Sequence, residues 1–393
     1  MSAVKIIRTS TVPESLAAFC RGLLRELQEQ EGYEVVAVSS PGAELDELGS
    51  REGVRTAAVA MERHISPWRD LKSLWRLVKV FRRERPAMVH SMTPKAGLLS
   101  MIAAWICRVP VRVHTFTGLV FPTATGLTQR ILILTDRVTC ACATHVIPEG
   151  EGVKNDLINY NITRKPLKVL GHGNVRGIDL DHYNPELPEV QAEAARLRRP
   201  DAFTFVFVGR LVRDKGINEL AEAFHRLHSE YPHTRLLLVG EMEQDLDPLK
   251  PETLNEIKHN DAINAVGRQS DVRPWLAASD ALVFPSYREG FPNIVIEAGA
   301  MGLPSIVTDI NGSREIIIEG RNGVIIPPRD TEALYNAMKR MAVTPTEASA
   351  MGAAARPLIA SRYEQTYVRR CLKEFYNEIL RKPIDTVSRQ SSK

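Results

Sequence analysis

Two cations in the second half of this 393-residue chain have a spacing that suits a phosphorylated ligand. Arg210 and Lys215 lie five residues apart and follow an apolar run that is typical of a buried strand. A guanidinium offers a planar fork of donors and an ammonium offers a compact charge, so that together they could bind a diphosphate. Two solvent-exposed cations without a ligand are the alternative interpretation of this spacing.

A segment further along the chain has the marks of an anion-binding helix N-terminus. An apolar run ends near Phe284, and Pro292 suits the first turn of a helix that would follow it. Free backbone N–H groups at such an N-terminus attract anions, and the helix dipole favours Glu289 just before the helix. The residues that would line this N-terminus are Gly290, Phe291, Pro292 and Asn293.

Glu297 lies about one turn inside the same predicted helix, between Ile296 and Ala298. A carboxylate buried in this largely apolar segment would be costly without hydrogen-bond donors. The hydroxyl groups of a sugar or a ribose would supply such donors, and an internal salt bridge is the alternative.

The elements that must position these residues are predicted to be strands and helices in alternation. Apolar, β-branched runs alternate with amphipathic stretches of helical length in both halves of the chain, which predicts βαβ units and two doubly wound parallel sheets. Ligands of such sheets bind outside the carboxyl ends of the strands, where the residues above fall. The predicted strands are Val4–Arg8, Glu34–Ser39, Ala87–His90, Val111–Thr115, Thr144–Ile147 and Leu167–Leu170, then Phe203–Val208, Arg235–Val239, Ala262–Val266, Ala281–Phe284 and Ser305–Thr308.

The length predicts two or three domains, and the charge differs between the two halves. Residues 1–180 hold 24 basic and 17 acidic side chains, whereas the remainder holds 27 and 30. The overall net charge of +4 is too small to require a nucleic-acid partner. We expect a first domain over 1–180, a second over 181–362, helices over 363–384 that pack back on the first domain, and a flexible tail over 385–393.

The sequence carries no sign of export or of a membrane span. The N-terminus lacks the apolar core of a secretory signal, and the longest apolar run, Leu98–Cys107, is half the roughly 20 residues that a span needs. Five cysteines without a framework spacing fit reduced thiols, and Cys140 and Cys142 are interpreted as buried thiols, since no second ligand pair suggests zinc. We therefore expect a cytoplasmic protein.

The second half of the chain resembles the donor site of retaining GT-B glycosyltransferases of family 4. The resemblance rests on FVFVGRLVRDKG, LLLVGE, AVGRQSDVRPWLAASDALVFPSYREGFPNIVIEA and IEGRNGVIIPPRD, in the order and spacing of that family. It implies two Rossmann-like domains with a cleft between them and a nucleotide diphosphate sugar, expected to be UDP-linked, as donor. It further implies that Arg210 and Lys215 hold the diphosphate, that Glu297 holds the ribose hydroxyls, and that Glu289 with the backbone of 290–293 holds the transferred sugar.

The first half resembles bacterial polysaccharide and glycan-assembly members of the family, which act on polyprenyl diphosphate carriers. In VHSMTPKAG and VRVHTFTG, His114 matches the family histidine that faces the sugar, and Lys95 is a candidate contact to the acceptor phosphate, with a surface charge as the alternative. Many members carry a Gly-Gly pair in the first loop, which here reads RTSTVPE. Thr9 or Ser10 would supply hydroxyl donors in its place, and Thr9 is a second candidate acceptor contact.

The segment Ser66–Arg85 is predicted to be an amphipathic helix with a basic face. Its apolar stripe comprises Trp68, Leu71, Trp75, Val78 and Phe81, and seven basic residues outnumber two acidic ones between positions 69 and 85. A basic helix with tryptophan can lie on an anionic membrane, so a peripheral contact with the inner face of the cell membrane is one interpretation. An ordinary helix that covers the sheet is the other.

The resemblance implies a hexosyltransferase that moves a sugar to a polyprenyl-diphosphate-linked sugar in lipopolysaccharide or capsule biosynthesis. His114, Glu289, Arg210 and Lys215 are then the expected catalytic residues. We expect no metal or other cofactor, because the Asp-Leu-Asp pairs at 179–181 and 245–247 do not directly follow a donor-sheet strand. The alternatives are a nucleotide-sugar 2-epimerase of the same fold and a non-catalytic protein that binds nucleotide sugars.

Overall fold

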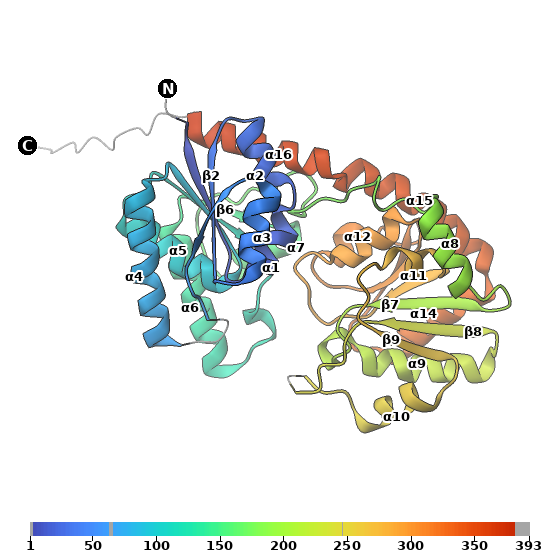
Figure 1. The fold of residues 1–393 in the computed structure, drawn as a ribbon. Coiled ribbons are helices and arrows are strands. Elements are labelled where there is room, and N and C mark those ends of the chain that lie inside the picture. Colours follow the sequence, from blue (N-terminus) through green and yellow to red (C-terminus); the bar gives the residue numbers. More distant parts are fainter. Residues whose placement is uncertain (1–2, 63–65, 246, 382–393) are drawn as a thin grey trace, which may run out of the picture. The chain divides into compact units, whose positions relative to one another are not determined.

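The chain divides into two compact units, each built on one parallel sheet (Figure 1). The computed structural model describes residues 3–62, 66–245 and 247–381. The first unit comprises the residues up to Arg176 together with those from Thr366 onward, and the second unit spans Gly177–Gln365. The predicted tail over 385–393 lies outside the described residues.

The sheet of the first unit has six parallel strands in the order β3-β2-β1-β4-β5-β6. The strand order reverses between β1 and β4, which makes a crevice outside their carboxyl ends. The strands are β1 (Lys5–Thr9), β2 (Glu34–Ser39), β3 (Arg55–Ala58), β4 (Met88–Met92), β5 (Val111–Phe116) and β6 (His145–Pro148).

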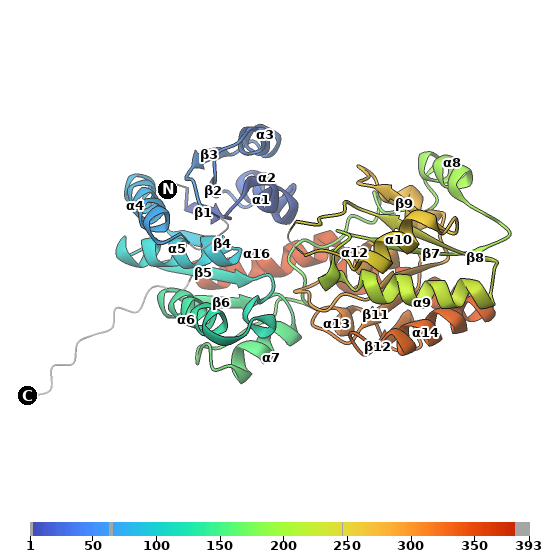
Figure 2. The same cartoon turned by 90° about the horizontal axis from the view of Figure 1, so that it is seen from below.

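Helices cover both faces of this sheet, so that its strands are buried on two sides (Figure 2). One apolar cluster packs α4 (Pro67–Glu84), α5 (Pro94–Ile106), α6 (Gly126–Cys142) and α7 (Glu151–Asn159) against one face. A second cluster packs α1 (Pro13–Cys20), α2 (Leu23–Glu29), α3 (Ala43–Glu52) and the C-terminal helix α16 (Gln365–Arg381) against the other. A short 3₁₀ turn, η1 (Phe121–Thr123), precedes α6.

The second unit repeats the same topology, with the order β12-β11-β10-β7-β8-β9. Its strands are β7 (Phe203–Val208), β8 (Thr234–Val239), β9 (Ile263–Gly267), β10 (Ala281–Phe284), β11 (Ser305–Thr308) and β12 (Gly323–Ile326). Its helices are α8 (Pro188–Leu197), α9 (Ile217–Glu230), α10 (Pro251–His259), α11 (Arg273–Ala277), α12 (Asn293–Ala300), α13 (Ser313–Ile316), α14 (Thr331–Val343) and α15 (Pro345–Tyr363), with a 3₁₀ turn η2 (Arg213–Lys215).

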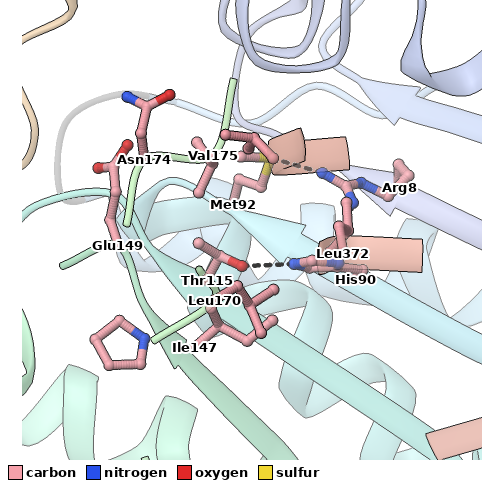
Figure 3. Close-up of a pocket in the computed structure, with 12 residues that line it drawn as sticks. Arg8, His90, Met92, Thr115, Ile147, Glu149, Leu170, Asn174, Val175 and Leu372 are labelled. Atoms are coloured by element: carbon pink, nitrogen blue, oxygen red, sulfur yellow. Dashed lines mark hydrogen bonds between the residues drawn. The ribbon is translucent and has the colours of Figure 1, made fainter. Parts of the chain in front are cut away.

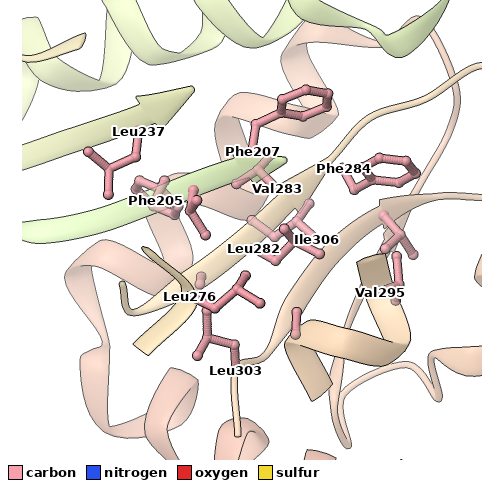
Figure 4. Packing of buried hydrophobic residues seen from close by; sticks show 14 of the residues in the cluster. Phe205, Phe207, Leu237, Leu276, Leu282, Val283, Phe284, Val295, Leu303 and Ile306 are labelled. Carbon is pink, nitrogen blue, oxygen red and sulfur yellow. The ribbon is translucent and has the colours of Figure 1, made fainter. Parts of the chain in front are cut away.

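The core of the second unit forms around its central strands. Phe205 and Phe207 of β7, Leu282 of β10 and Ile306 of β11 are fully buried, with Val295 of α12 against them (Figure 4). Strands covered by helices on both faces read as nearly continuous apolar runs, which is why FTFVFV and ALVF were recognisable in the sequence.

The predicted fold class is confirmed, but one predicted strand is absent and two strands were missed. Leu167–Leu170 is not a strand, because this segment leaves the sheet edge after one bridge between Leu167 and Val146. The edge strands β3 and β12 were not predicted. The sequence of β3, RTAA, is short and half-exposed, and the sequence of β12, GVII, begins directly after a turn, so neither has a clear strand pattern.

Candidate functional site

Arg210 leaves the carboxyl end of β7 on a loop that packs tightly against the loop after β8. A Cβ on Gly240 would lie 1.8 Å from the carbonyl oxygen of Gly209, so only glycine permits this approach. The Arg210 guanidinium is half-exposed, and its Nη1 donates to Glu243 Oε2 at 2.8 Å. The structure therefore places the cation at the end of the sheet where ligands of such folds bind.

Lys215 lies at the end of η2 and forms an ion pair with Glu289. The hydroxyl of Ser286 also donates to Glu289 Oε1, at 3.0 Å, and the Lys215 ammonium lies 5.6 Å from the ring centroid of Phe284. The loops after β7 and β10 touch here, because a Cβ on Gly216 would lie 2.2 Å from the Pro285 carbonyl oxygen. Two residues that the sequence assigned to one donor site are thus in direct contact.

The predicted helix N-terminus is present as the start of α12, at Asn293, with Pro292 in the preceding N-cap position. The loop before it packs against the loop after β11, since a Cβ on Gly312 would lie 2.6 Å from the Gly290 carbonyl oxygen. The Phe291 ring is buried edge-on against Tyr363. Phe291 can therefore contribute its backbone to a ligand, whereas its side chain belongs to the core.

Glu297 lies in the second turn of α12 and is 8% exposed. Its carboxylate is therefore largely shielded from water. Its role toward a ribose stays a prediction.

A cavity of about 350 Å³ next to Arg210 was not predicted from the sequence. It lies at the carboxyl ends of β7, β8 and β9, and polar groups enter it from three loops. These polar groups could have been predicted from the sequence, because they directly follow apolar runs that are typical of buried strands. The lining residues that follow these strands are Gly209 and Arg210, then Gly240, Glu241 and Glu243, and finally Arg268 and Gln269.

No metal site is found in residues 3–62, 66–245 and 247–381, where no group of three or more His, Cys, Asp or Glu side chains lies close enough to hold an ion. Asp247 instead forms an ion pair with Arg213 at 2.9 Å. Independence from metal stays a prediction.

The side chain of His114 lies inside the first unit, which favours a structural role over the expected contact with a sugar. It is 1% exposed, its Nδ1 lies 2.8 Å from Ser91 Oγ, and a Cβ on Gly97 would lie 2.3 Å from its ring. Burial lowers the pKa of His114 to about 3, so the ring is neutral. β5 extends to Phe116, so that His114 lies within the strand, as the predicted strand Val111–Thr115 already implied, and beneath α5.

The two candidate acceptor contacts also have partners within the first unit. Thr9 is fully buried, and its hydroxyl accepts a hydrogen bond from Ser100 of α5 at 2.9 Å, so that its expected contact with an acceptor stays a prediction. Lys95, at the start of α5, forms an ion pair with Asp70 of α4 at 2.5 Å. A phosphate near Lys95 would therefore have to share the Lys95 ammonium with Asp70 or displace the Asp70 carboxylate from it.

The loop that lacks the Gly-Gly pair uses hydroxyl groups to meet the start of α5. Thr11 Oγ1 accepts from the Ala96 amide at 3.2 Å and lies 2.8 Å from Thr93 Oγ1. Thr93 has a φ of 66°, which is a strained conformation for a β-branched residue. Side-chain hydroxyls thus fix this loop, in which the resemblance led us to expect a Gly-Gly pair.

Arg8 of β1 forms a buried cluster that the sequence did not suggest (Figure 3). Its Nη1 donates to His90 Nδ1 at 3.0 Å and to Tyr376 of α16 at 2.5 Å, and His90 Nε2 donates to Thr115 Oγ1 at 2.7 Å when Nδ1 is the acceptor. The adjoining cavity, at about 20 Å³, has room for a water molecule but not for a sugar. The cluster therefore fastens α16 to the carboxyl ends of β1, β4 and β5.

The predicted apolar stripe of α4 divides into a buried and an exposed half. Val78 and Phe81 pack against the sheet, whereas Trp68 is 85% exposed and Trp75 is more than half exposed. The N-terminal half of α6 adds further exposed apolar side chains to the same unit, namely Leu127, Ile131 and Leu134. In the described residues, no helix has both the length and the apolar character that crossing a bilayer requires.

Two family models match the chain, one in each unit. The model described as "Glycosyl transferase 4-like domain" matches residues 16–173, and the model described as "Glycosyl transferases group 1" matches residues 202–343.

Curated relatives and solved structures match most of the chain. The capsular polysaccharide biosynthesis glycosyltransferase CapM of Staphylococcus aureus is 29% identical over 97% of this chain and 99% of its own. The Escherichia coli protein named UDP-Gal:alpha-D-GlcNAc-diphosphoundecaprenol alpha-1,3-galactosyltransferase is 30% identical over 71% of this chain and 72% of its own. The crystal structure of HepE from Anabaena in complex with UDP has a TM-score of 0.77 at 17% identity, covering 96% of this chain and 100% of that one, and shows the same fold.

Proposed function

Because the chain belongs to the group 1 family of GT-B glycosyltransferases, we propose that it moves a sugar from a UDP-sugar to a polyprenyl-diphosphate-linked sugar, with retention of anomeric configuration. The observation that carries the proposal is the meeting of Lys215 and Glu289 at the carboxyl ends of β7 and β10, with Lys215 on the loop after β7 that also carries Arg210. The product would enter a capsular or related cell-surface polysaccharide.

The donor assignment is supported by the chemistry of the second unit. The cavity beside Arg210 could take the nucleoside, and Arg210 and Lys215 offer two positive charges to the diphosphate. The names of two similar proteins agree in nucleotide, since HepE was crystallised with UDP and the Escherichia coli relative is named for UDP-Gal.

The acceptor assignment is supported by the same Escherichia coli relative, whose name gives a diphosphoundecaprenol-linked sugar as acceptor. CapM, which matches nearly the whole chain, is named for capsular polysaccharide biosynthesis. Lys95 is the cation of the first unit that we assign to the acceptor phosphate, in exchange with Asp70.

In the proposed reaction, the bond between the sugar C1 and the β-phosphate oxygen of UDP breaks, and the acceptor oxygen bonds to C1 on the same face. The acceptor proton passes to the departing phosphate oxygen, and UDP leaves. Arg210 and Lys215 neutralise the charge that grows on the diphosphate, while Glu289 holds a sugar hydroxyl. We propose that no metal takes part, because the two cations and the start of α12 already face the diphosphate.

We also propose that the first unit rests on the inner face of the cell membrane. The exposed Trp68 and Trp75 lie on a helix rich in lysine and arginine, and anionic lipid headgroups complement that charge. A lipid-linked acceptor would be reached from such a position.

Thermal unfolding with a panel of nucleotides tests the donor assignment. A ligand that binds the folded state raises the melting temperature, so UDP and UDP-sugars should stabilise the protein more than ADP or GDP at equal concentration. EDTA should leave turnover unchanged. Conversion of a UDP-sugar without any acceptor would favour the 2-epimerase instead, and UDP-sugar binding with no change in any glycan product would favour a non-catalytic protein.

A further inference from the structure

The loop that follows β8 is attached to the donor loop that carries Arg210 and Lys215. Leu211 N donates to the Glu241 carbonyl at 2.7 Å, and Arg213 N donates to the Asp247 carbonyl at 3.2 Å. The two loops therefore share two backbone hydrogen bonds within the Arg210–Lys215 segment.

Asp247 makes the strongest side-chain contribution to this attachment. Its Oδ2 accepts from the backbone N–H of Asp214 at 2.6 Å, and its Oδ1 pairs with Arg213 at 2.9 Å. The Asp247 side chain is only about a fifth exposed, whereas Arg213 is mostly exposed, so the hydrogen bond to the Asp214 amide contributes more than the ion pair, which solvent screens. One carboxylate thus fixes two successive residues that directly precede Lys215.

Asp214 passes the connection on to the loop that carries Glu289. Its carbonyl accepts from the Tyr287 amide at 2.9 Å, and its Oδ2 pairs with Arg288 at 3.3 Å. Ser286, next to Tyr287 in the chain, donates its hydroxyl proton to Glu289 Oε1 at 3.0 Å. Through Asp214, the carboxylate of Asp247 therefore supports both loops that meet in the Lys215–Glu289 pair.

We propose that Asp247 is a positioning residue for the donor site, which holds the Arg210–Lys215 loop and, through Asp214, the loop before Glu289 in the arrangement that receives a diphosphate. The inference rests on the proposed donor function. It gives the Asp-Leu-Asp sequence at 245–247 a role through one of its two carboxylates, without a metal ion.

Isothermal titration of UDP and of uridine into the wild type and three variants tests the proposal. Asp247→Ala should weaken UDP binding by about tenfold, which is the loss expected for one hydrogen bond to a charged group, while uridine binding changes less than twofold. Asp247→Asn retains an oxygen for the Asp214 amide and should recover most of the UDP affinity. Asp245→Ala is the matched control, since this exposed carboxylate lies two residues away. Its loss should change the affinity for neither UDP nor uridine.

Hydrogen–deuterium exchange gives a second measurement that does not depend on ligand. Asp247→Ala should speed exchange at the Asp214 and Tyr287 amides, whereas Asp247→Asn, which retains the acceptor oxygen, and Asp245→Ala should not. Equal UDP affinity in Asp247→Ala and the wild type, or equal losses in Asp247→Ala and Asp245→Ala, would overturn the positioning role. Failure of the wild type to bind UDP at all would instead overturn the proposed donor function, and this inference with it.

Discussion

Lys215 and Glu289, which lie 74 residues apart in the sequence, form an ion pair in which both side chains are less than a fifth exposed. The pair joins the loop after β7 to the loop after β10. The Lys215 ammonium is thus neutralised by the Glu289 carboxylate before a diphosphate binds. Donor binding would then have to weaken or break this ion pair, so that the ammonium can contact the diphosphate.

The two members of this pair should respond in opposite ways to substitution. Lys215→Ala removes a diphosphate contact and should weaken UDP binding by about ten- to a hundredfold. Glu289→Gln frees the ammonium, so UDP should bind at least as tightly as in the wild type, while transfer of the sugar is lost. Titration calorimetry and a transfer assay measure the two effects.

Lys258→Ala, at an exposed lysine of α10, is the control for the loss of one positive charge and should leave UDP binding unchanged. If Glu289→Gln weakened UDP binding as strongly as Lys215→Ala does, the Glu289 carboxylate would support the diphosphate site. The proposal that Lys215 holds the diphosphate and Glu289 the sugar would then be wrong.

His114 should matter for stability and not for turnover. His114→Gln disturbs a buried hydrogen bond to Ser91, which should lower the free energy of unfolding by about 1–3 kcal/mol and leave the kcat of the folded enzyme within about twofold. Thermal unfolding and initial rates at saturating substrate measure these effects. A large fall in kcat without loss of stability would restore the catalytic role that the sequence suggested.

The same residue gives a dependence of stability on pH. Because burial lowers the pKa of His114 to about 3, the folded state binds fewer protons than the unfolded state below about pH 6.5. The stability that neutral His114 contributes is therefore lost as the pH falls from about 6.5 toward 3. The wild type should lose more melting temperature over this interval than His114→Gln does.

Asp136 of α6 predicts a pH dependence of the opposite sign. Burial raises its pKa from 3.8 to about 7, so the folded state holds a proton that the unfolded state has released between these values. Stability is then lost as the pH rises through this interval. Asp136→Asn should raise the melting temperature more at pH 8 than at pH 5. An equal change at both pH values would show that this carboxyl group titrates normally.

The exposed tryptophans of α4 should be needed for binding to anionic membranes. Replacing both Trp68 and Trp75 by serine should reduce sedimentation with vesicles that contain anionic lipid, at low salt, by about tenfold, because two apolar anchors are lost. Trp105→Ser is the matched control. Trp105 is 58% exposed and lies at the C-terminal end of α5, whereas Trp68 lies at the N-terminal end of α4. No sedimentation of the wild type, or equal losses in control and double variant, would argue against a membrane contact through α4.

Local sequence patterns predicted much of this structure, and distant pairings explain most of what they missed. Buried strands such as FTFVFV, the helix start near Pro292 and the position of Arg210 after a strand follow from nearby residues. The Lys215–Glu289 pair and the bond between Arg8 and Tyr376, which spans 368 residues, depend on which loops and helices the topology brings together. The predicted strand Val111–Thr115 already contained His114, whereas the burial of its side chain depends on Gly97 and Ser91, which lie on other elements.

The most direct test of the account is the product formed from a UDP-sugar and a polyprenyl-diphosphate-linked N-acetylhexosamine, analysed by mass spectrometry and by NMR of the new linkage. We predict, for one UDP-sugar of a panel, an acceptor heavier by one sugar residue, with the anomeric configuration of the donor. An inverted linkage would contradict retention. Binding of UDP with no product from any member of the panel, or donor conversion without the acceptor, would contradict the proposed transfer itself.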